Sequence, residues 1–446
     1  MTRRWLMGLV MSCLVVAGAS ATERRDFPPA SADHTSSAVA SSWFELLYEV
    51  VRAERTPPPG AARIYGIASV ALYEASAAGS HKLRSLVGQL NGLSSLPRPA
   101  RGHTYYWPAV ANAALADTVR GLYPAMTPAS LAAVTELESE FAARHRYRAS
   151  PGTLARSVTL GRNLARGVLA WSASDLLTLH ANCAYVPAES GPGGWQPTPP
   201  AFNANPLQPC WGSIRTIVLN SGDECFAKPP PRFSTSTRSP FHAAALEVYL
   251  TGLSLSWEQK VIADYWSDGP GATGTPPGHW IAIVSQIARR RHLSLADAAE
   301  AYARVGIAVH DAFIACWRVK YAYDLLRPVT YIQRYIDPGW SPYIVTPNFP
   351  TYTSGHSTQS GAAARVLTGM FGRVRFTDTT HRDHSLIPAQ QPRSFDSFDA
   401  AAEEAAQSRL YGGIHFPFDN DAGLVAGRCI GRAIERRVQF RRTYPW

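Results

Sequence analysis

Three short clusters late in the chain carry side chains suited to chemistry on an anion. The first pairs Lys320 with Arg327, the second ends at His356, and the third runs from Arg409 to Asp419. Together they supply three cations, a hydroxyl group, a glycine amide and two imidazoles. These are the donors that bind a highly charged tetrahedral oxyanion, so the sequence predicts such a site.

The first cluster ends an apolar helical stripe. A helix is predicted to begin at Ser294 and to carry Lys320 on its apolar face. Lys320 alone could simply extend its ammonium group to water. Arg327, seven residues later, would share that face if the helix continued, although Pro328 disfavours helix at the junction. We therefore expect both cations to point into one space.

The second cluster precedes another helical stretch. The Ser354 hydroxyl and the Gly355 amide would lie at a helix N-terminus, where anions bind favourably. His356 would then be within reach of the anion. On its own the cluster also fits an ordinary helix cap followed by a surface histidine.

The third cluster places His415 after a turn allowed by Gly412-Gly413. Asp419, near the start of the last helix, could accept a hydrogen bond from one imidazole nitrogen and leave the other facing a metal or a phosphorus atom. A single histidine in a turn is more often structural. The prediction therefore depends on all three clusters together.

The combined pattern resembles the vanadium haloperoxidase and type 2 phosphatidic acid phosphatase superfamily. It consists of Lys320-x6-Arg327-Pro328, Ser354-Gly355-His356 and Ser408-Arg409-x5-His415-x3-Asp419. Three other segments look like parts of secreted bacterial haloperoxidase homologues: Trp195 to Pro200, Trp266 to Pro270 and Pro276 to Trp280. The resemblance covers roughly residues 40–446. Thr353 departs from it, because the family usually has proline there, but this change removes no donor.

The resemblance implies a role for each residue. His415 would ligate vanadium, His356 would act as acid and base, and Asp419 would orient His415. The expected cofactor is vanadate, and phosphate could occupy the same site. The residues that would bind its oxygens are Lys320, Arg327, Ser354, Gly355 and Arg409. Trp317 and Phe349 match positions that chloride-oxidising members fill beside the cofactor, although both are equally compatible with plain core.

The implied activity is oxidation of halide by hydrogen peroxide to hypohalous acid, which halogenates a small organic acceptor. Lys320 would polarise the bound peroxide. The alternative is an exported acid phosphatase in which His415 attacks phosphorus and His356 protonates the leaving oxygen. A non-catalytic oxyanion-binding protein would leave both histidines without a role. The sequence is compatible with a homo-oligomer but does not specify one.

Helical periodicity dominates the pattern, and period-2 strands are scarce. The predicted class is all-α, as two packed four-helix-type bundles over residues 40–183 and 237–446, joined by an irregular Pro/Gly-rich connection over 184–236. Helix starts are expected at Ser42 and Thr127. Further helical patterning covers 61–78, 151–173, 238–252, 255–266, 279–290, 294–320, 356–372, 396–411 and the residues after Asp419.

Residues 1–21 have the order of regions of a secretory signal, so we expect a secreted or periplasmic protein cleaved near Ala21, with residues 22–39 as a flexible N-terminus. A membrane anchor is the alternative, but the apolar stretch is shorter than the ~20 residues that cross a bilayer. No later segment is apolar enough to span one.

The net charge limits the classes of partner that we expect, and the cysteine content bears on disulfide formation. Loss of Arg3 and Arg4 with the signal takes the formal charge from +10 to +8, which suits anionic ligands. Without a long basic run, nucleic acid is not expected as a partner. An oxidising compartment would permit one disulfide among Cys183, Cys210 and Cys225, with the pairing left open. Cys316 and Cys429 are expected to be small buried side chains in helices.

Overall fold

The computed structural model describes residues 31–180, 183–188 and 191–442, and its regular structure is almost entirely helical. The all-α class predicted from periodicity is confirmed. The first helices are α1 (Ala38–Ala53), α2 (Pro58–Ala77), α3 (Trp107–Leu122), α4 (Pro128–His145), α5 (Pro151–Ala173) and α6 (Leu177–His180). They are followed by α7 (Pro240–Leu253), α8 (Trp257–Tyr265), α9 (Thr275–Arg290), α10 (Leu295–Tyr323) and α11 (Pro328–Tyr335). The last are α12 (Gly355–Phe371), α13 (Thr380–Asp383), α14 (Phe398–Tyr411) and α15 (Pro417–Arg437).

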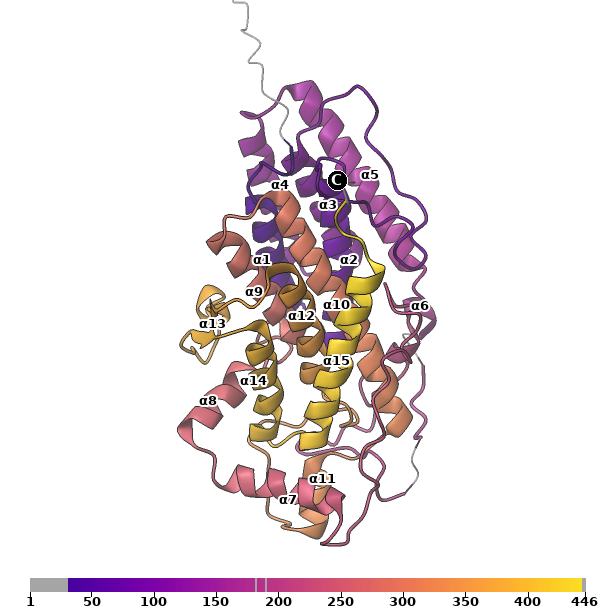
Figure 1. Cartoon of the computed structure of the whole chain (residues 1–446), viewed down its shortest axis with the longest axis vertical. Helices are drawn as coiled ribbons and strands as arrows, with labels where there is room; N and C mark the ends of the chain where they lie inside the picture. Colours follow the sequence, from indigo (N-terminus) through magenta and orange to yellow (C-terminus); the bar gives the residue numbers. More distant parts are fainter. Residues whose placement is uncertain (1–30, 181–182, 189–190, 443–446) are drawn as a thin grey trace, which may run out of the picture.

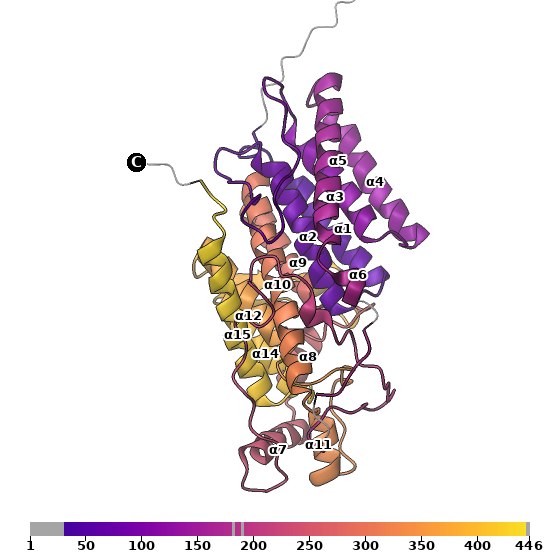
Figure 2. The ribbon, with the colours of Figure 1, turned by 90° about the vertical axis from the view of Figure 1, so that its right-hand side faces the viewer.

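The long helices form two groups that lie side by side in an elongated molecule (Figures 1 and 2). Helices α1 to α5 make one group, and α10, α12, α14 and α15 make the other, with α12 packed most extensively on α15. Helix α2 packs along α10 and joins the groups. One apolar core runs through both, because side chains from Trp43 in α1 to Ile434 in α15 belong to the same buried cluster.

Helix starts follow the capping chemistry of the sequence in most places. The Thr127 hydroxyl accepts from the Ser130 backbone N–H at the start of α4, as predicted. The expected start at Ser42 is wrong, because α1 already begins at Ala38 after Ser37. Helix α3 was not predicted at all. Its buried side consists mainly of small alanine side chains, which give a weaker apolar signal than Leu, Ile or Phe.

The segment from Cys183 to Ser236 has no long helix or strand among its described residues; a 3-10 turn, η1 (Trp211–Ser213), is its regular element. Its path is fixed by polar contacts instead. The Asp311 carboxylate on α10 accepts the backbone N–H groups of Ile217, Val218 and Leu219 at 2.6–2.9 Å. Irregular backbone needs such partners wherever it is buried.

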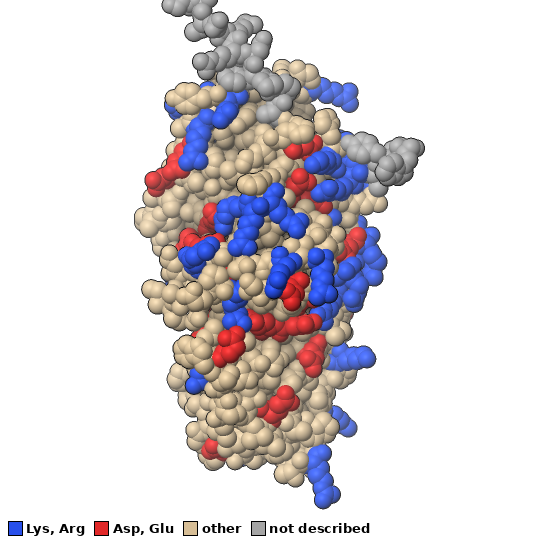
Figure 3. Space-filling model, turned by 60° about the vertical axis from the view of Figure 1, so that its left-hand side comes forward, with Lys and Arg blue, Asp and Glu red and all other residues tan. Residues whose placement is uncertain are grey.

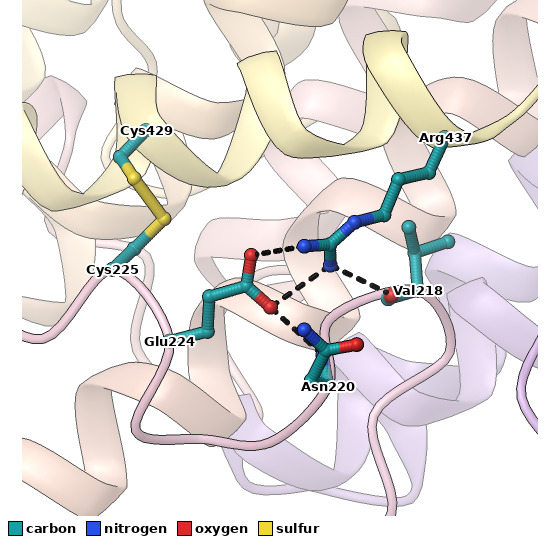
Figure 4. The surroundings of a disulfide bond; sticks show 6 residues. All are labelled: Val218, Asn220, Glu224, Cys225, Cys429 and Arg437. Carbon is teal, nitrogen blue, oxygen red and sulfur yellow. Dashed lines mark hydrogen bonds and ion pairs between the residues drawn. A yellow bond between two sulfur atoms is a disulfide. The ribbon is translucent and has the colours of Figure 1, made fainter.

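Two disulfides also hold this segment. Cys183 pairs with Cys210, as one of the pairings left open by the sequence. Cys225 pairs with Cys429 on α15, so the expectation that Cys429 is an unpaired core residue is wrong (Figure 4). The reason is tertiary, because residues 217–225 cross against α15, where Glu224 forms two ion contacts with Arg437 at 2.6 and 2.8 Å. Cys316 remains a free, buried thiol.

The predicted signal lies outside the described residues. From residue 31 onward the expected flexible N-terminus is packed against the body, because Ala32 is fully buried and Asp33 is 8% exposed. Among the described residues, no helix is both long and apolar enough to cross a membrane. Figure 3 shows basic side chains interleaved with acidic ones over the middle of one face, and few charged side chains toward its lower end.

The two strands form a small accessory hairpin. Strand β1 (Phe376–Asp378) pairs antiparallel with β2 (Arg393–Phe395), with Phe376 opposite Phe395. Asp378, the last residue of β1, is fully buried beneath the helices. The hairpin thus delivers one carboxylate into the C-terminal group.

Candidate active site

A cavity of about 540 Å³ is lined by residues of the second and third predicted clusters, and the first cluster lies behind one of its walls. Gly355 and His356 come from the start of α12, Arg409 from the end of α14, and His415 from the loop before α15. One wall is aromatic and is formed by Phe313, Trp317 and Phe349. Lys320 and Arg327 lie behind this wall and are fully buried.

Lys320 and Arg327 meet without a continuous helix between them. Helix α10 ends at Tyr323, and Asp324 follows with a left-handed φ of +46°. Helical spacing therefore does not align the two cations. Backbone carbonyls do: Lys320 Nζ donates to Pro350 and Thr351 at 2.8 and 2.9 Å.

The guanidinium of Arg327 is fixed in a similar way. Nε donates to the Phe349 carbonyl at 2.7 Å, and Nη1 donates to the Ile414 carbonyl at 2.9 Å. Nη2 is buried and has no hydrogen-bond partner among the described residues. One nitrogen of the guanidinium is therefore left for a ligand.

Ser354 caps α12, as the sequence predicts. Its hydroxyl accepts from the Ser357 backbone N–H, and Gly355 is the first helical residue. His356 faces the cavity, and its Nε2 atom is buried without a partner among the described residues. The helix N-terminus and this imidazole therefore both face the same space.

His415 lies off the regular helices, in the loop where Gly413 adopts a φ of +73°. Its Nδ1 is 2.9 Å from Asp419 Oδ2, an oxygen that also accepts the Phe416 backbone N–H at 3.0 Å. An Nδ1–H that donates to the carboxylate leaves Nε2 unprotonated, with a lone pair that accepts from Arg327 and that a metal would take instead. Nε2 lies 3.2 Å from Arg327 Nη1. This is the orientation predicted for a metal-ligating imidazole.

Burial dominates the electrostatics of the site. It lowers the pKa of Arg327 to about 9 and that of Arg409 to about 10, although Asp419 and Asp268 respectively act in the opposite direction. It also lowers the pKa of Lys320, and Arg327 adds to this effect. Each shift reflects the cost of burying a cation, which the nearby carboxylates offset only in part.

The two histidines are neutral for the same reason. Burial lowers the pKa of His415 and of His356 well below the ordinary value, and the neighbouring arginines lower both further. Burial raises the pKa of Asp419, against the hydrogen bond from Thr351 and the charges of Lys320 and Arg327. The three donors to its Oδ2 favour the carboxylate form.

The donor set fits a bound vanadate or phosphate. Arg409 and a helix N-terminus line the cavity, two further buried cations lie behind its wall, and Asp419 is the carboxylate that faces Lys320 and Arg327. The unpartnered Arg327 Nη2 and His356 Nε2 are two further donor or acceptor positions that an oxyanion would satisfy.

Trp317 and Phe349 lie where the sequence interpretation placed them, at the cavity. Their ring centroids are 5.0 Å apart. Lys320 Nζ is 5.0 Å from the Phe349 centroid, and the Arg327 guanidinium is 4.7 Å from it. These distances allow cation–π contact, so Trp317 and Phe349 do more than fill the hydrophobic core.

Several contributing residues were missed by the sequence analysis. Phe313 extends the aromatic wall, and Thr351 bridges the site by offering its carbonyl to Lys320 and its hydroxyl to Asp419. Asp268 lines the cavity and is bound to His279. Asp268 and His279 lie in two segments that were noted only because they resemble haloperoxidase homologues. These segments are rich in proline and glycine, so they gave no local signal for a buried ion pair.

Comparison with known proteins agrees with this geometry. A family described as the VCPO second helical-bundle domain matches residues 300–339 and 333–442. The structure superposes on a bacterial vanadium-dependent iodoperoxidase with a TM-score of 0.84 and 33% sequence identity, covering 91% of this chain and 97% of that one. This chain belongs to the vanadium haloperoxidase family.

Other members of the family are more distant. A bacterial vanadium-dependent chloroperoxidase shares the fold, with a TM-score of 0.66 at 18% identity over 84% of this chain and 91% of its own. The vanadium chloroperoxidase of Curvularia inaequalis is 28% identical over 277 residues, or 47% of this chain. The chain spans 46% of that relative's length.

Proposed function

We propose that this chain is a vanadium-dependent haloperoxidase that uses hydrogen peroxide to oxidise halide to hypohalous acid, for transfer to an organic acceptor. One observation carries the proposal: Arg409 and two neutral imidazoles, His356 and His415, line one cavity, and buried Lys320 and Arg327 lie directly behind its aromatic wall. Membership of the haloperoxidase family supports the same reaction class.

We assign the residues as follows. Arg327, Arg409, Lys320, Ser354 and Gly355 hold the oxygens of vanadate, and His415 supplies its nitrogen ligand through Nε2. When bound, vanadate activates peroxide as a Lewis acid. Asp419 keeps the Nδ1 proton of His415 in place, so that Nε2 remains available. Lys320 would donate a hydrogen bond to an oxygen of peroxide, and His356 Nε2 would accept the proton that hydrogen peroxide loses on binding.

The aromatic wall of Trp317, Phe349 and Phe313 has a separate role in this proposal. It excludes water from one side of the cavity and provides an apolar approach for a weakly hydrated halide ion. Cation–π contacts with Lys320 and Arg327 hold the Phe349 ring in position.

The test is reconstitution with orthovanadate. We expect the vanadate-loaded protein to halogenate a phenol indicator with peroxide and bromide or iodide, to lose this activity when vanadate is removed, and to regain it on addition. Equal activity after thorough vanadate removal would overturn the proposal.

A phosphatase with the same donor set is the alternative outcome. In that case His415 attacks phosphorus and His356 protonates the leaving group. Robust hydrolysis of a phosphomonoester, with no halide oxidation at any pH tested, would identify this activity instead.

We further propose that the protein works outside the cytoplasm. The two disulfides support this, because such bonds persist mainly in oxidising compartments. The signal-like pattern of residues 1–21 supports it independently. Mass spectrometry of protein from the culture medium or periplasm should find an N-terminus near residue 22, whereas intact Met1 on cytoplasmic protein would contradict it.

A further inference from the structure

A buried ion cluster lies behind the cavity wall. His279, near the start of α9, has Nδ1 2.9 Å from Asp268 Oδ2 and Nε2 2.7 Å from Asp378 Oδ2. His279 and Asp378 are fully buried, and Asp268 is 3% exposed. Both ring nitrogens face carboxylate oxygens, which only accept hydrogen bonds, so the imidazole carries a proton on each. His279 is therefore a cation held between two anions.

Asp378 anchors the side of the cluster that faces away from the cavity. Its other oxygen accepts from Gln286 Nε2 at 3.1 Å and from the Thr380 backbone N–H at 2.9 Å. A carboxylate with donors on both oxygens stays ionised. Burial alone would lower the pKa of His279, but the charges of Asp268 and Asp378 raise it to about 10.

The opposite side of the cluster is the segment from Trp266 to Asp268, between α8 and α9. Asp268 has a φ of +47°, in the left-handed region that non-glycine residues rarely occupy. The Trp266 ring stacks on the His279 ring, with centroids 4.4 Å apart and planes inclined by 20°. His279 thus contacts both ends of this three-residue segment.

The same segment reaches the oxyanion site through its backbone. The Trp266 carbonyl accepts from Arg409 Nη2 at 2.7 Å, and Asp268 lines the cavity beside His356 and Arg409. A hydrogen bond with the Trp266 backbone also acts on His356. A shift of this carbonyl would therefore move the guanidinium assigned to an oxygen of the anion.

We propose that His279 is a positioning residue for the oxyanion site: by binding Asp268 and stacking on Trp266, it holds the Trp266 carbonyl where it orients Arg409. The inference rests on the proposed function in taking the oxyanion to be vanadate. The order of contacts runs from Asp378 through His279 to Trp266 and Asp268, and then to Arg409. The residues in this series of contacts lie on β1, on α9, in the loop after α8 and on α14.

The test compares two buried histidines by oxyanion binding. His279→Gln removes the cation but keeps a side-chain donor. His381→Gln is the matched control, because His381 stacks on Tyr265 and bonds its carbonyl at 2.9 Å, and has no hydrogen bond with Asp268 or Asp378. Calorimetry measures the binding of orthovanadate, and separately of inorganic phosphate, to each vanadate-free protein.

We expect His279→Gln to weaken binding of both anions by ~10–100-fold, the usual effect of losing an orienting partner. His381→Gln should change it less than about threefold. Wild-type affinity in His279→Gln, or equal losses in both variants, would overturn the inference. Tight oxyanion binding by wild type without halide oxidation would overturn only the proposed function.

Two further measurements separate positioning from general stability. In a double-mutant cycle, Asp268→Asn combined with His279→Gln should bind vanadate no more weakly than the weaker single variant, because both act on one contact. Additive losses would contradict this. Nitrogen-15 NMR of the wild-type protein at pH 8 should show both His279 ring nitrogens protonated. A neutral ring would overturn the inference even if no His279 variant folds.

Discussion

Lys320 differs from the two arginines in the number of donors that remain available. Its ammonium has three hydrogens, and two are directed to the Pro350 and Thr351 carbonyls. One hydrogen therefore remains available for a ligand. The ammonium group presents it as a compact point charge. Arg327 instead donates from Nε and Nη1 to backbone carbonyls, and Arg409 donates from Nη2 to the Trp266 carbonyl, so each planar guanidinium is held in a fixed orientation that suits it to hold oxygens in place.

We therefore expect Lys320→Ala to lower turnover beyond its effect on vanadate affinity. Removing one preorganised donor costs ~100–1,000-fold in turnover in hydrolytic enzymes, and we take this as the scale. Bromide oxidation should be measured at saturating vanadate with bound vanadium quantified. The exposed Lys228→Ala is the control. A fully loaded Lys320→Ala protein that turns over at the wild-type rate would show that Lys320 only neutralises charge.

Asp419 should act through His415. Asp419→Asn keeps the size of the side chain but weakens its acceptance of the Nδ1 proton, so the imidazole can adopt the tautomer with a proton on Nε2. We expect vanadate affinity to fall ~10–100-fold, with a smaller loss than in His415→Ala. Titration with orthovanadate measures both. Unchanged affinity in Asp419→Asn would remove the orienting role.

At the level of elements, the site is assembled where helices begin and end. Helix α10 ends at Tyr323, α12 begins at Gly355, α14 ends at Tyr411, and α15 begins at Pro417. Helix termini leave unpaired backbone groups, and here some of these face the cavity. The cluster around His279 does not come from these helix termini, because its residues lie on strand β1, on helix α9 and in the loop before α9.

The cluster around His279 predicts a pH dependence of stability. Its pKa is raised from an unfolded value near 6.5 to about 10, so the contribution is complete below pH ~6.5 and is lost progressively up to pH ~10. The facing charged or titratable groups are Asp268, Asp378, Tyr265 and His381, with His356 and Arg409 toward the cavity. We expect the free energy of unfolding of wild type to fall with pH more steeply than that of His279→Gln, by up to ~1.4 kcal/mol per pH unit.

Urea unfolding of both proteins at pH 7, 8 and 9 measures this difference. His381→Gln should keep the wild-type slope. Parallel pH profiles for wild type and His279→Gln would mean that His279 is neutral in the folded protein.

Sequence patterns predicted those parts of the site that depend on local structure. The cap at Ser354 and the turn at Gly413 follow from short-range backbone chemistry, and both are present. The expectation that a shared helix face brings Lys320 and Arg327 together was wrong. Backbone carbonyls of residues 349–351 orient the two side chains instead. The ion pairs of His279 join residues 11 and 99 positions away, and no local pattern encodes such a contact.

At the scale of the whole molecule, the lining of the cavity is mostly uncharged. Its charged or titratable lining residues are Asp268, His356, Arg409 and His415, and the remaining lining residues are uncharged. Val345 lies in this uncharged part and is 67% exposed. Such a wall favours neutral, apolar acceptors over charged ones.

We expect Val345→Asp to raise the KM for a neutral phenol by about fivefold, equivalent to ~1 kcal/mol of lost apolar contact. Val425→Asp is the matched control, because Val425 on α15 is 65% exposed and does not line the cavity. Steady-state kinetics with the phenol varied at saturating halide measure this effect. Equal KM values in the two variants would indicate that the acceptor reacts away from this wall.

The bond between Cys225 and Cys429 has a topological consequence. All residues assigned to the site, from Asp268 to Asp419, lie between these two cysteines, so the catalytic half is a covalent macrocycle. In the chain-entropy description, closing a ring with a separation of 204 residues stabilises the fold by about 5 kcal/mol. A protease that cuts once inside the ring opens it without releasing a fragment. The nicked chain therefore keeps every ligand of the anion in one molecule.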